Sequence, residues 1–331
     1  MQNNIVIIGF GKQGQEYFES IEKLSNITIK AIVDSSFYEE NHLEKARLKV
    51  REDIVILDKV EDLKEYENCT AIICIPHKYH FEITKNCIKK GFNIIKEKPL
   101  DYSYLNAKKL EDISIKYNKK IFTLCQRIYD PIFSEFIRKI NLIGKPYALQ
   151  YDYFLSHNKT VGWRSKKELA CGGVLLDMGY HIIDTINSFF GEIIETNSYS
   201  AFSNEETKKE ILEDYTTISF KNRREVIGTI NIGRNFHKKK EYITVFCDQG
   251  VAEISPKKGF SIYNNNGQEV YKLEVHVKNE EVTRNQIQDF LNIINFKDEY
   301  SYRKHLNRHL LNVETIDKIY SKQQINFINS I

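Results

Sequence analysis

Three polar side chains interrupt an otherwise apolar stretch, CGGVLLDMGYHIID, at residues 171–184. Asp177, His181 and Asp184 are spaced i, i+4 and i+7, so on an α-helix they would share one face. A buried carboxylate or imidazole costs free energy unless it is paired. The face is therefore either a hydrogen-bonded seam in a core or the wall of a site that exchanges protons, and the stretch alone does not decide. Such groups could also bind a metal ion. No second histidine lies nearby in helical register, however, and we expect no bound metal.

A second set of reactive side chains lies in IKEKP at residues 95–99, the end of an apolar run. An extended strand would put Lys96 and Lys98 on one side and Glu97 on the other. An ammonium group can donate to a substrate oxygen and stabilise a developing alkoxide, and an imidazole titrates near neutral pH. Lys98 and His181 could thus handle the hydroxyl proton while a hydride leaves an alcohol carbon. Which of them takes the proton first stays open, and a charged loop entry is the alternative interpretation of the lysines.

A glycine motif indicates the hydride carrier. GFGKQG at residues 9–14 follows one expected strand, opens one expected helix, and precedes Asp34, which ends the next strand twenty residues past Gly14. In such a dinucleotide fingerprint Gly9 permits a tight turn, Gly11 lets the backbone approach the pyrophosphate, and Gly14 lets helix and strand pack closely. The amides of the helix N-terminus would bind the phosphates.

Asp34 also predicts the form of the cofactor. Its carboxylate would accept hydrogen bonds from the adenosine ribose hydroxyls and repel a 2′-phosphate. Ser35 and Ser36 follow it, where an arginine would help to bind that phosphate. NAD(H) is therefore favoured over NADP(H).

The elements that must position these groups fall into two patterns. Within residues 1–125 apolar runs alternate with helical segments, which predicts a doubly wound parallel sheet. From 192 to 275 the chain reads mainly as strands joined by short turns, and two helices follow at 284–296 and 305–322. We expect an α/β fold with a dinucleotide-binding Rossmann domain at 1–125. A substrate-binding and oligomerisation α+β domain with a mainly antiparallel open sheet would occupy 126–331.

Composition excludes several classes of protein. A 331-residue chain with 41% hydrophobic residues, 28% charged residues and a net charge of +3 gives no reason to expect nucleic acid or a membrane as partner. The basic clusters at 237–240 and 303–309 are interpreted as solvated faces. The first residues form an apolar strand without a basic leader, so we expect no signal peptide. The six cysteines include no CxxC pair, which is typical of buried thiols in a reducing cytosol, and we expect a cytoplasmic protein.

These motifs together resemble the Gfo/Idh/MocA family, the oxidoreductases named for glucose–fructose oxidoreductase and inositol dehydrogenase. The resemblance runs the full length and rests on GFGKQG, Asp34, IPHKYH at 75–80, EKP at 97–99, and GWR with GGVLLDMGYHIID. It implies that Lys98 is the catalytic lysine, that His181 exchanges the proton, and that Asp177 is its companion near the substrate hydroxyl. Cys171 departs from the serine or glycine common there.

The expected contacts extend beyond those three residues. We expect cofactor contacts from Gly9, Phe10, Gly11, Lys12, Gln13, Gly14, Asp34, Ser35, Ile75, Pro76, His77, His80, Glu97, Lys98 and Gln126, and substrate contacts from Lys98, Arg127, Tyr153, Trp163, Arg164, Asp177, Tyr180 and His181.

The expected activity is NAD(H)-dependent interconversion of a secondary alcohol and a ketone in a sugar, a cyclitol or a sugar derivative, nucleotide-linked sugars included. One alternative is reduction of a C=N or C=C bond in a non-sugar metabolite, and another is a regulator that binds NAD without turnover. The resemblance also implies that the antiparallel sheet pairs between subunits, giving a homodimer or homotetramer.

Overall fold

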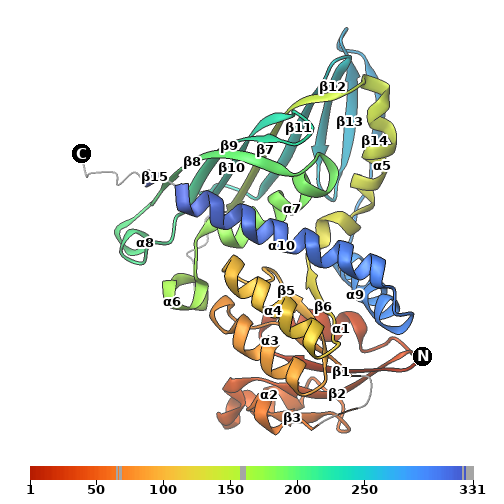
Figure 1. Ribbon diagram of the computed structural model, residues 1–331, viewed down its shortest axis with the longest axis vertical. Helices are drawn as coiled ribbons and strands as arrows, with labels where there is room; N and C mark the ends of the chain where they lie inside the picture. Colours follow the sequence, from red (N-terminus) through yellow and green to blue (C-terminus); the bar gives the residue numbers. More distant parts are fainter. Residues whose placement is uncertain (65, 67–68, 157–161, 323, 326–331) are drawn as a thin grey trace. The chain divides into compact units, whose positions relative to one another are not determined.

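The computed structural model describes residues 1–64, 66, 69–156, 162–322 and 324–325. They form two compact units, each described here by itself (Figure 1). The first unit comprises Met1–Leu124 with Asn279–Leu310, and the second comprises Cys125–Lys278 with the residues from Leu311 on.

The first unit is built on a six-stranded parallel sheet of order β3-β2-β1-β4-β5-β6. Its central strands are buried along nearly their whole length, because helices cover both faces of such a sheet. The expected doubly wound fold is confirmed. Its strands are β1 (Asn3–Ile8), β2 (Ile27–Val33), β3 (Val55–Leu57), β4 (Cys69–Ile73), β5 (Asn93–Glu97) and β6 (Ile121–Leu124), and its helices are α1 (Lys12–Ile21), α2 (Glu40–Arg47), α3 (His80–Lys89), α4 (Tyr104–Lys116), α9 (Asn279–Asn295) and α10 (Glu299–Lys322), of which α10 continues into the second unit.

The two closing helices were expected in the second domain, and for α9 and the first half of α10 this was wrong. Phe290 of α9 stacks on Phe122 of β6, with ring centroids 4.6 Å apart. The backbone N–H of Thr123 donates to Nε2 of His305 at 2.9 Å. His305 is 8% and His309 0% exposed, so the basic cluster at 303–309 is not a wholly solvated face.

Two elements of the first unit were not predicted. Helix α2 is largely polar and has one buried residue, Ala46, so it lacks an apolar stripe. Strand β3 is three residues long and none of its side chains is fully buried. The short helix expected at 61–67 falls partly outside the described residues, and a 3₁₀ turn at Val60–Asp62 stands at its start.

The second unit is built on a nine-stranded sheet of order β14-β13-β12-β11-β7-β10-β9-β8-β15. The pairs β7–β10 and β8–β15 are parallel, and the other neighbours are antiparallel. This confirms the expected mainly antiparallel sheet. Its strands are β7 (Pro146–Ser156), β8 (Ile193–Ala201), β9 (Tyr215–Asn222), β10 (Ile227–Phe236), β11 (Lys240–Cys247), β12 (Gly250–Ser255), β13 (Gly259–Asn264), β14 (Glu269–Glu274) and β15 (Gln324–Ile325), and its helices are α5 (Pro131–Lys139), α6 (Lys167–Ala170), α7 (Tyr180–Phe189) and α8 (Glu205–Lys209).

One face of this sheet forms a core and the other does not. Buried and exposed residues alternate along β7 and β9, as in a sheet packed on one side.

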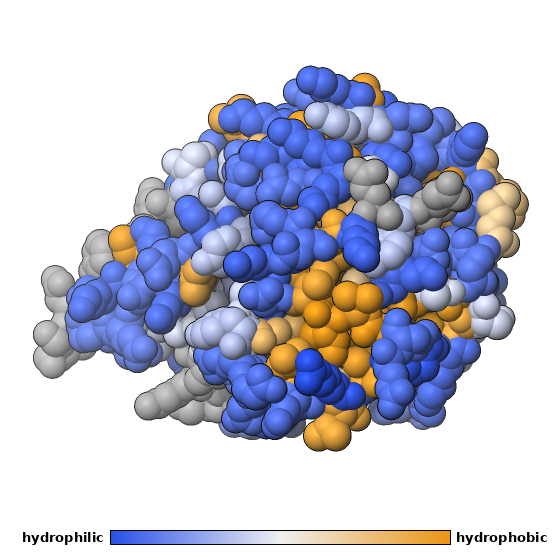
Figure 2. Space-filling model, turned by 90° about the horizontal axis from the view of Figure 1, so that it is seen from below, coloured by the Kyte–Doolittle hydropathy of each residue, from blue (hydrophilic) through white to orange (hydrophobic). Residues whose placement is uncertain are grey.

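By length and composition Lys167–Phe189 could cross a membrane, but 72% of its apolar window is buried inside the protein, as in a core helix. The face drawn in Figure 2 is largely hydrophilic, with one hydrophobic patch, which agrees with the 28% of charged residues.

Candidate functional site

The glycine loop of the first unit has the geometry of a dinucleotide site. Gly9 has φ +89°, and a Cβ there would lie 2.3 Å from the carbonyl oxygen of Cys74. A Cβ on Gly14 would lie 2.0 Å from the oxygen of Gly9, so this position also excludes a side chain. A Cβ on Gly11 would meet nothing within 4 Å, which leaves open space beside the start of α1. No side chain caps that helix end, so its amides can bind phosphate.

Asp34 fastens this loop from the end of β2. One carboxylate oxygen accepts the backbone N–H of Phe10 at 2.6 Å, and the other accepts the N–H and hydroxyl of Ser36 at 2.9 and 2.7 Å. Asp34 is half-exposed and holds a negative charge where an adenosine ribose would lie. The side chain of Phe10 packs edge-on against Phe18 and Phe37, and it also lines a cavity beside Ser36.

The two lysines at the end of β5 and just after it, Lys96 and Lys98, have different surroundings. Lys98 is 8% exposed and precedes a cis peptide bond to Pro99, while Glu97 is half-buried and accepts the hydroxyl of Tyr17. Lys96 is 0% exposed and donates to the carbonyl oxygen of Leu100 at 2.7 Å. Burial lowers the pKa of Lys96 to about 7, although the nearby Asp101 opposes the shift. Lys96 is thus a structural group in β5 that holds the following turn, which carries Lys98.

His80, expected to contact the cofactor, has a buried side chain. Its side chain is 0% exposed, and its ring nitrogens lie 3.1 Å from the carbonyl oxygens of Pro99 and Ile75. Burial, with the charges of Lys96 and His77, places the pKa of His80 well below its usual value. The imidazole therefore ties the turn after β4 to the turn after β5.

The remaining expected cofactor residues differ in exposure. His77 is 3% exposed and packs edge-on against His80, so its side chain is also unavailable. At least partly exposed are Gly11, Lys12, Gln13, Asp34, Ser35, Ile75, Pro76, Glu97 and Gln126.

The stretch at 171–184 is not the regular α-helix that was expected. Cys171 has φ +61°, residues Leu175–Gly179 form a π-helical turn, and α7 begins at Tyr180. Because a π turn takes an additional residue, it shifts the face presented by Asp177 relative to that of His181. Such turns occur frequently at functional sites.

A buried carboxylate anchors the start of this turn. Glu213 accepts the N–H groups of Gly173 and Leu175, both at 3.1 Å, and the hydroxyl of Tyr320 at 2.8 Å. Burial raises the pKa of Glu213, and these hydrogen bonds oppose the shift. A Cβ on Gly173 would lie 2.4 Å from the carbonyl oxygen of Glu213, so the glycine is needed for close approach.

Asp177 is paired with two arginines. Its Oδ2 lies 2.7 Å from Arg234 and 3.5 Å from Nε of Arg164. The side chains of Asp177 and Arg234 are 15% and 10% exposed, and that of Arg164 is 46% exposed. Trp163 and Arg164 lie together in a 3₁₀ turn, with the guanidinium 4.2 Å from the indole ring centre. The expected tryptophan–arginine pair therefore reaches Asp177 through Arg164.

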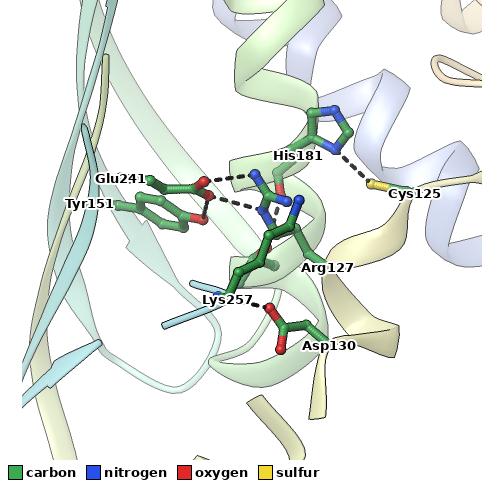
Figure 3. Close-up of polar contacts among 8 residues, drawn as sticks. Cys125, Arg127, Asp130, Tyr151, His181, Glu241 and Lys257 are labelled. Atoms are coloured by element: carbon green, nitrogen blue, oxygen red, sulfur yellow. Dashed lines mark hydrogen bonds and ion pairs between the residues drawn. The ribbon is translucent and has the colours of Figure 1, made fainter. Parts of the chain in front are cut away.

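His181 and Asp184 have different surroundings. Nδ1 of His181 lies 3.3 Å from Sγ of Cys125 (Figure 3), a contact that sets the plane of a half-buried imidazole. Asp184 is 0% exposed and accepts the amide of Asn312 at 2.6 Å. Asp184 is therefore a buried structural group, whereas Asp177 and His181 are partly exposed.

Figure 3 also shows a second ionic cluster of the second unit, formed by Arg127, Glu241 and Tyr151. Arg127 donates to both carboxylate oxygens of Glu241, at 2.9 and 2.7 Å, and the hydroxyl of Tyr151 donates to Glu241 at 2.8 Å. Burial is the largest single effect and acts to lower the pKa of Arg127, but the charge of Glu241 together with Tyr151, Tyr153 and Cys125 raises the pKa overall. Arg127 was expected to bind substrate; its guanidinium is 6% exposed and is held by the carboxylate of Glu241.

The two tyrosines expected at the substrate site differ. Tyr180 is 0% exposed, so its expected contact with substrate was wrong. Tyr153 is 7% exposed and lies opposite Glu241 of β11 and Ile232 of β10. Burial and then the charge of Glu241 raise its pKa to about 12.

Several residues of this site were missed. In INIGRNF, residues 230–236, the alternation that buries Ile230 and Ile232 also puts Arg234 on the inner face, and this signal could have been used. Glu213 and Cys125 gave no local signal, because their partners lie far along the chain. In the described part of the chain, no three or more His, Cys, Asp or Glu side chains are grouped to hold a metal ion.

Two family sequence models match the chain. One, described as an oxidoreductase family with an NAD-binding Rossmann fold, matches residues 3–124, and the other, the GFO/IDH/MocA C-terminal domain, matches residues 139–253. Together they cover more than two thirds of the chain.

Known proteins with similar sequences or folds include enzymes. The myo-inositol 2-dehydrogenase of Thermotoga maritima is 23% identical over 251 residues, covering 74% of this chain and 73% of that enzyme. An uncharacterized protein of Saccharomyces cerevisiae is 26% identical over 248 residues, covering 65% of this chain and 70% of its own. A mutant of KijD10, a 3-ketoreductase from Actinomadura kijaniata in complex with TDP-benzene and NADP, matches with a TM-score of 0.85 at 13% identity, over 99% of this chain and 100% of that one. This last likeness establishes the fold.

Proposed function

This chain belongs to the GFO/IDH/MocA family of NAD(P)-binding oxidoreductases, and we propose that it interconverts a secondary alcohol and a ketone in a sugar, cyclitol or sugar derivative. The observation that carries this proposal is the π turn, which presents Asp177 and His181 on a helix anchored by a buried carboxylate. Similarity to a myo-inositol 2-dehydrogenase and the fold of a 3-ketoreductase support a hydroxyl or keto substrate.

We propose that Lys98 and His181 handle the substrate proton. The nicotinamide cofactor supplies the hydride acceptor or donor, and the chain must move one proton on or off the substrate oxygen. The ammonium of Lys98 would donate to that oxygen and stabilise alkoxide charge. The imidazole of His181, oriented through Nδ1 by Cys125, can exchange the proton near neutral pH. Asp177, held by Arg234, would accept a hydrogen bond from a substrate hydroxyl.

We propose NAD(H) as the preferred form of the cofactor. The carboxylate of Asp34 at the end of β2 disfavours a 2′-phosphate by charge repulsion. One observation favours the other form: beside Ser36 a cavity of about 300 Å³ is lined by His42, Lys45 and Lys49, which could attract that phosphate. Titration of the protein with NADH and with NADPH decides the matter, because our proposal predicts the lower Kd for NADH.

A direct test of the activity mixes the protein with NAD and a panel of sugars, cyclitols and nucleotide sugars while the absorbance of the reduced cofactor is followed. The proposal predicts turnover with at least one polyhydroxylated substrate. Turnover only with imines or activated alkenes would replace it by the C=N or C=C reductase. Tight cofactor binding with no turnover of any substrate would favour a regulator instead.

We propose that the outer face of the second unit's sheet pairs with a second copy of the chain, in a homodimer or homotetramer. This face exposes Tyr147, Ile194 and Ile227 at 57%, 43% and 57%. A groove of about 600 Å³ crosses strands β7 to β10, and apolar surface of this kind marks interaction sites. Light scattering during size-exclusion chromatography tests it, and a monomeric mass would contradict it.

We propose a reducing compartment for the protein, as in the cytoplasm. None of the six cysteines, all of which lie among the described residues, forms a disulfide, and burial raises the pKa of Cys69 and of Cys87 to about 12. Thiols of this kind pack as small apolar groups.

A further inference from the structure

The second unit gathers cations around Tyr153. The guanidinium carbon of Arg127 lies 5.9 Å from the centre of the tyrosine ring, and Nζ of Lys239 lies 5.7 Å from it. The half-buried Lys257 extends along Arg127 in Figure 3. Burial lowers the pKa of Lys257 to about 8, with further contributions from the charges of Arg127 and Lys239. Three cations therefore lie within electrostatic reach of one another.

The carboxylates near these cations are already engaged. Glu241 accepts two bonds from Arg127 and one from the hydroxyl of Tyr151. Asp130 is 2% exposed and accepts the backbone N–H of Ile132, which caps α5, and that of Lys257 at 3.2 Å. Within the described residues, Glu241 and Asp130 are thus the two carboxylates set against the three cations, and Glu241 is bound to Arg127.

Cationic side chains also outnumber carboxylates in the ion pairs made by the π turn. There Asp177 is shared by Arg234 and Arg164. The charges of Glu241 and, less strongly, of Asp177 both raise the pKa of the Tyr153 hydroxyl. Among the residues that the structure describes, the contacts at Tyr153, Lys257 and the π turn involve five cationic side chains and three carboxylates: Arg127, Lys239, Lys257, Arg234 and Arg164, with Glu241, Asp130 and Asp177. Like charges held together in a partly desolvated site cost free energy that a bound anion relieves.

We propose that the substrate carries an anionic group, a carboxylate or a phosphate, which binds to Lys239 and Lys257 beside Tyr153. This inference rests on the proposed function, because it names the class of polyhydroxylated substrate: a sugar acid or a sugar phosphate, in place of a neutral cyclitol. Lys239 is exposed and its ammonium can move to meet the anion. The hydroxyl of Tyr153, protonated because its pKa is raised to about 12, can donate a further hydrogen bond.

The test measures binding and turnover separately. Trp163, the single tryptophan of the chain, lies against Arg164, so its fluorescence reports ligands at this site. The cofactor-loaded protein is titrated with D-glucose, D-glucuronate and D-glucose 6-phosphate, for the wild type and for Lys239→Gln, Lys257→Gln and Lys238→Gln. Lys238 is the exposed neighbour and serves as the matched control. Circular dichroism checks that each variant is folded.

We expect at least one anionic probe to bind about tenfold or more tightly than glucose, since charge-assisted hydrogen bonds are the stronger kind. Lys239→Gln and Lys257→Gln should each weaken it about fivefold or more, Lys238→Gln should not, and added salt should weaken the anions alone. The Kd values of D-glucuronate and D-glucose 6-phosphate then show whether the site prefers a carboxylate or a phosphate. Equal binding of glucose and both anions, no binding of either anion, or an equal loss in Lys238→Gln would overturn the inference.

Turnover separates this inference from the proposed function. Turnover of neutral sugars without preference for their acids or phosphates would overturn the anionic substrate and leave the oxidoreductase assignment intact. Lysine-dependent anion binding without turnover of any probe or sugar would support the anion site and count against the proposed reaction.

Discussion

Glu213 is predicted to hold the catalytic turn in place. It is the acceptor for two backbone N–H groups and one tyrosine hydroxyl, all within 3.1 Å. Glu213→Ala would leave these donors without an acceptor, at about 1–3 kcal/mol for each buried group. The expected loss is about 3–5 kcal/mol, a large part of the stability of a typical domain. Glu213→Gln keeps one acceptor but turns an NH₂ group toward a donor, so about 2–3 kcal/mol is expected.

The assay combines stability and kinetics. Urea unfolding gives the loss of stability, and steady-state kinetics give kcat and KM for Glu213→Gln and Tyr320→Phe. Because the anchored turn carries Asp177 and His181, we expect kcat to fall about tenfold or more in Glu213→Gln. The Kd of the cofactor should stay unchanged, since the glycine loop belongs to the first unit.

Glu210 provides a matched control for this prediction. It lies close by in the chain, is half-exposed, and accepts one backbone N–H, that of Lys167, at 2.9 Å. Glu210→Gln should cost at most about 1 kcal/mol and leave kcat unchanged. The reasoning would be refuted if Glu213→Gln matched this control, or if it lost stability while the folded fraction kept wild-type kcat.

Three further predictions concern the first unit. Gly14→Ala should destabilise the fold, because its Cβ would lie 2.0 Å from the carbonyl oxygen of Gly9. Gly11→Ala has open space around its Cβ, so this variant should stay folded but bind NADH about tenfold more weakly. Calorimetry measures the melting temperatures and titration measures NADH binding, and equal melting temperatures of the two variants would refute the contrast. Lys96 has a pKa of about 7 in the folded protein, against 10.5 for an unperturbed lysine. Unfolding therefore takes up a proton between these two pH values, and native stability rises with pH there, by up to about 1.4 kcal/mol per pH unit. The stability difference between wild type and Lys96→Met, measured in urea, should grow with pH across that window, and a constant difference would contradict it. Asp34→Asn should shift the ratio of NADH to NADPH affinities about tenfold toward NADPH, and an unchanged ratio would argue against ribose recognition by Asp34.

The parts of the fold that could be predicted depend on local signals. The glycine loop, Asp34 and the buried strands are written in short segments whose periodicity and turn residues agree. The alternation that identified β7 and β9 also predicted a sheet with one packed face. The π turn could not be predicted, because its anchor, Glu213, is about forty residues away in the chain.

Unit membership and side-chain availability were harder to predict for the same reason. Helix α9 belongs to the first unit because Phe290 stacks on Phe122 of β6, a contact that periodicity alone does not reveal. His80 and Tyr180 were placed in the site by their position in a motif, yet both are 0% exposed. A motif selects the backbone segment, whereas tertiary packing decides which way each side chain turns.

The central claim is that Lys98 and His181 exchange the substrate proton during hydride transfer. The most direct measurement is the single-turnover rate of cofactor reduction for the wild type, Lys98→Ala and His181→Ala, with Lys78→Ala, an exposed lysine before α3, as control. Loss of a positioned proton-transfer group costs about 10²- to 10⁴-fold in rate. We predict such a loss for Lys98→Ala and His181→Ala, with the Kd for NADH within about twofold of wild type. Near wild-type rates in both variants, with cofactor binding intact, would contradict the claim.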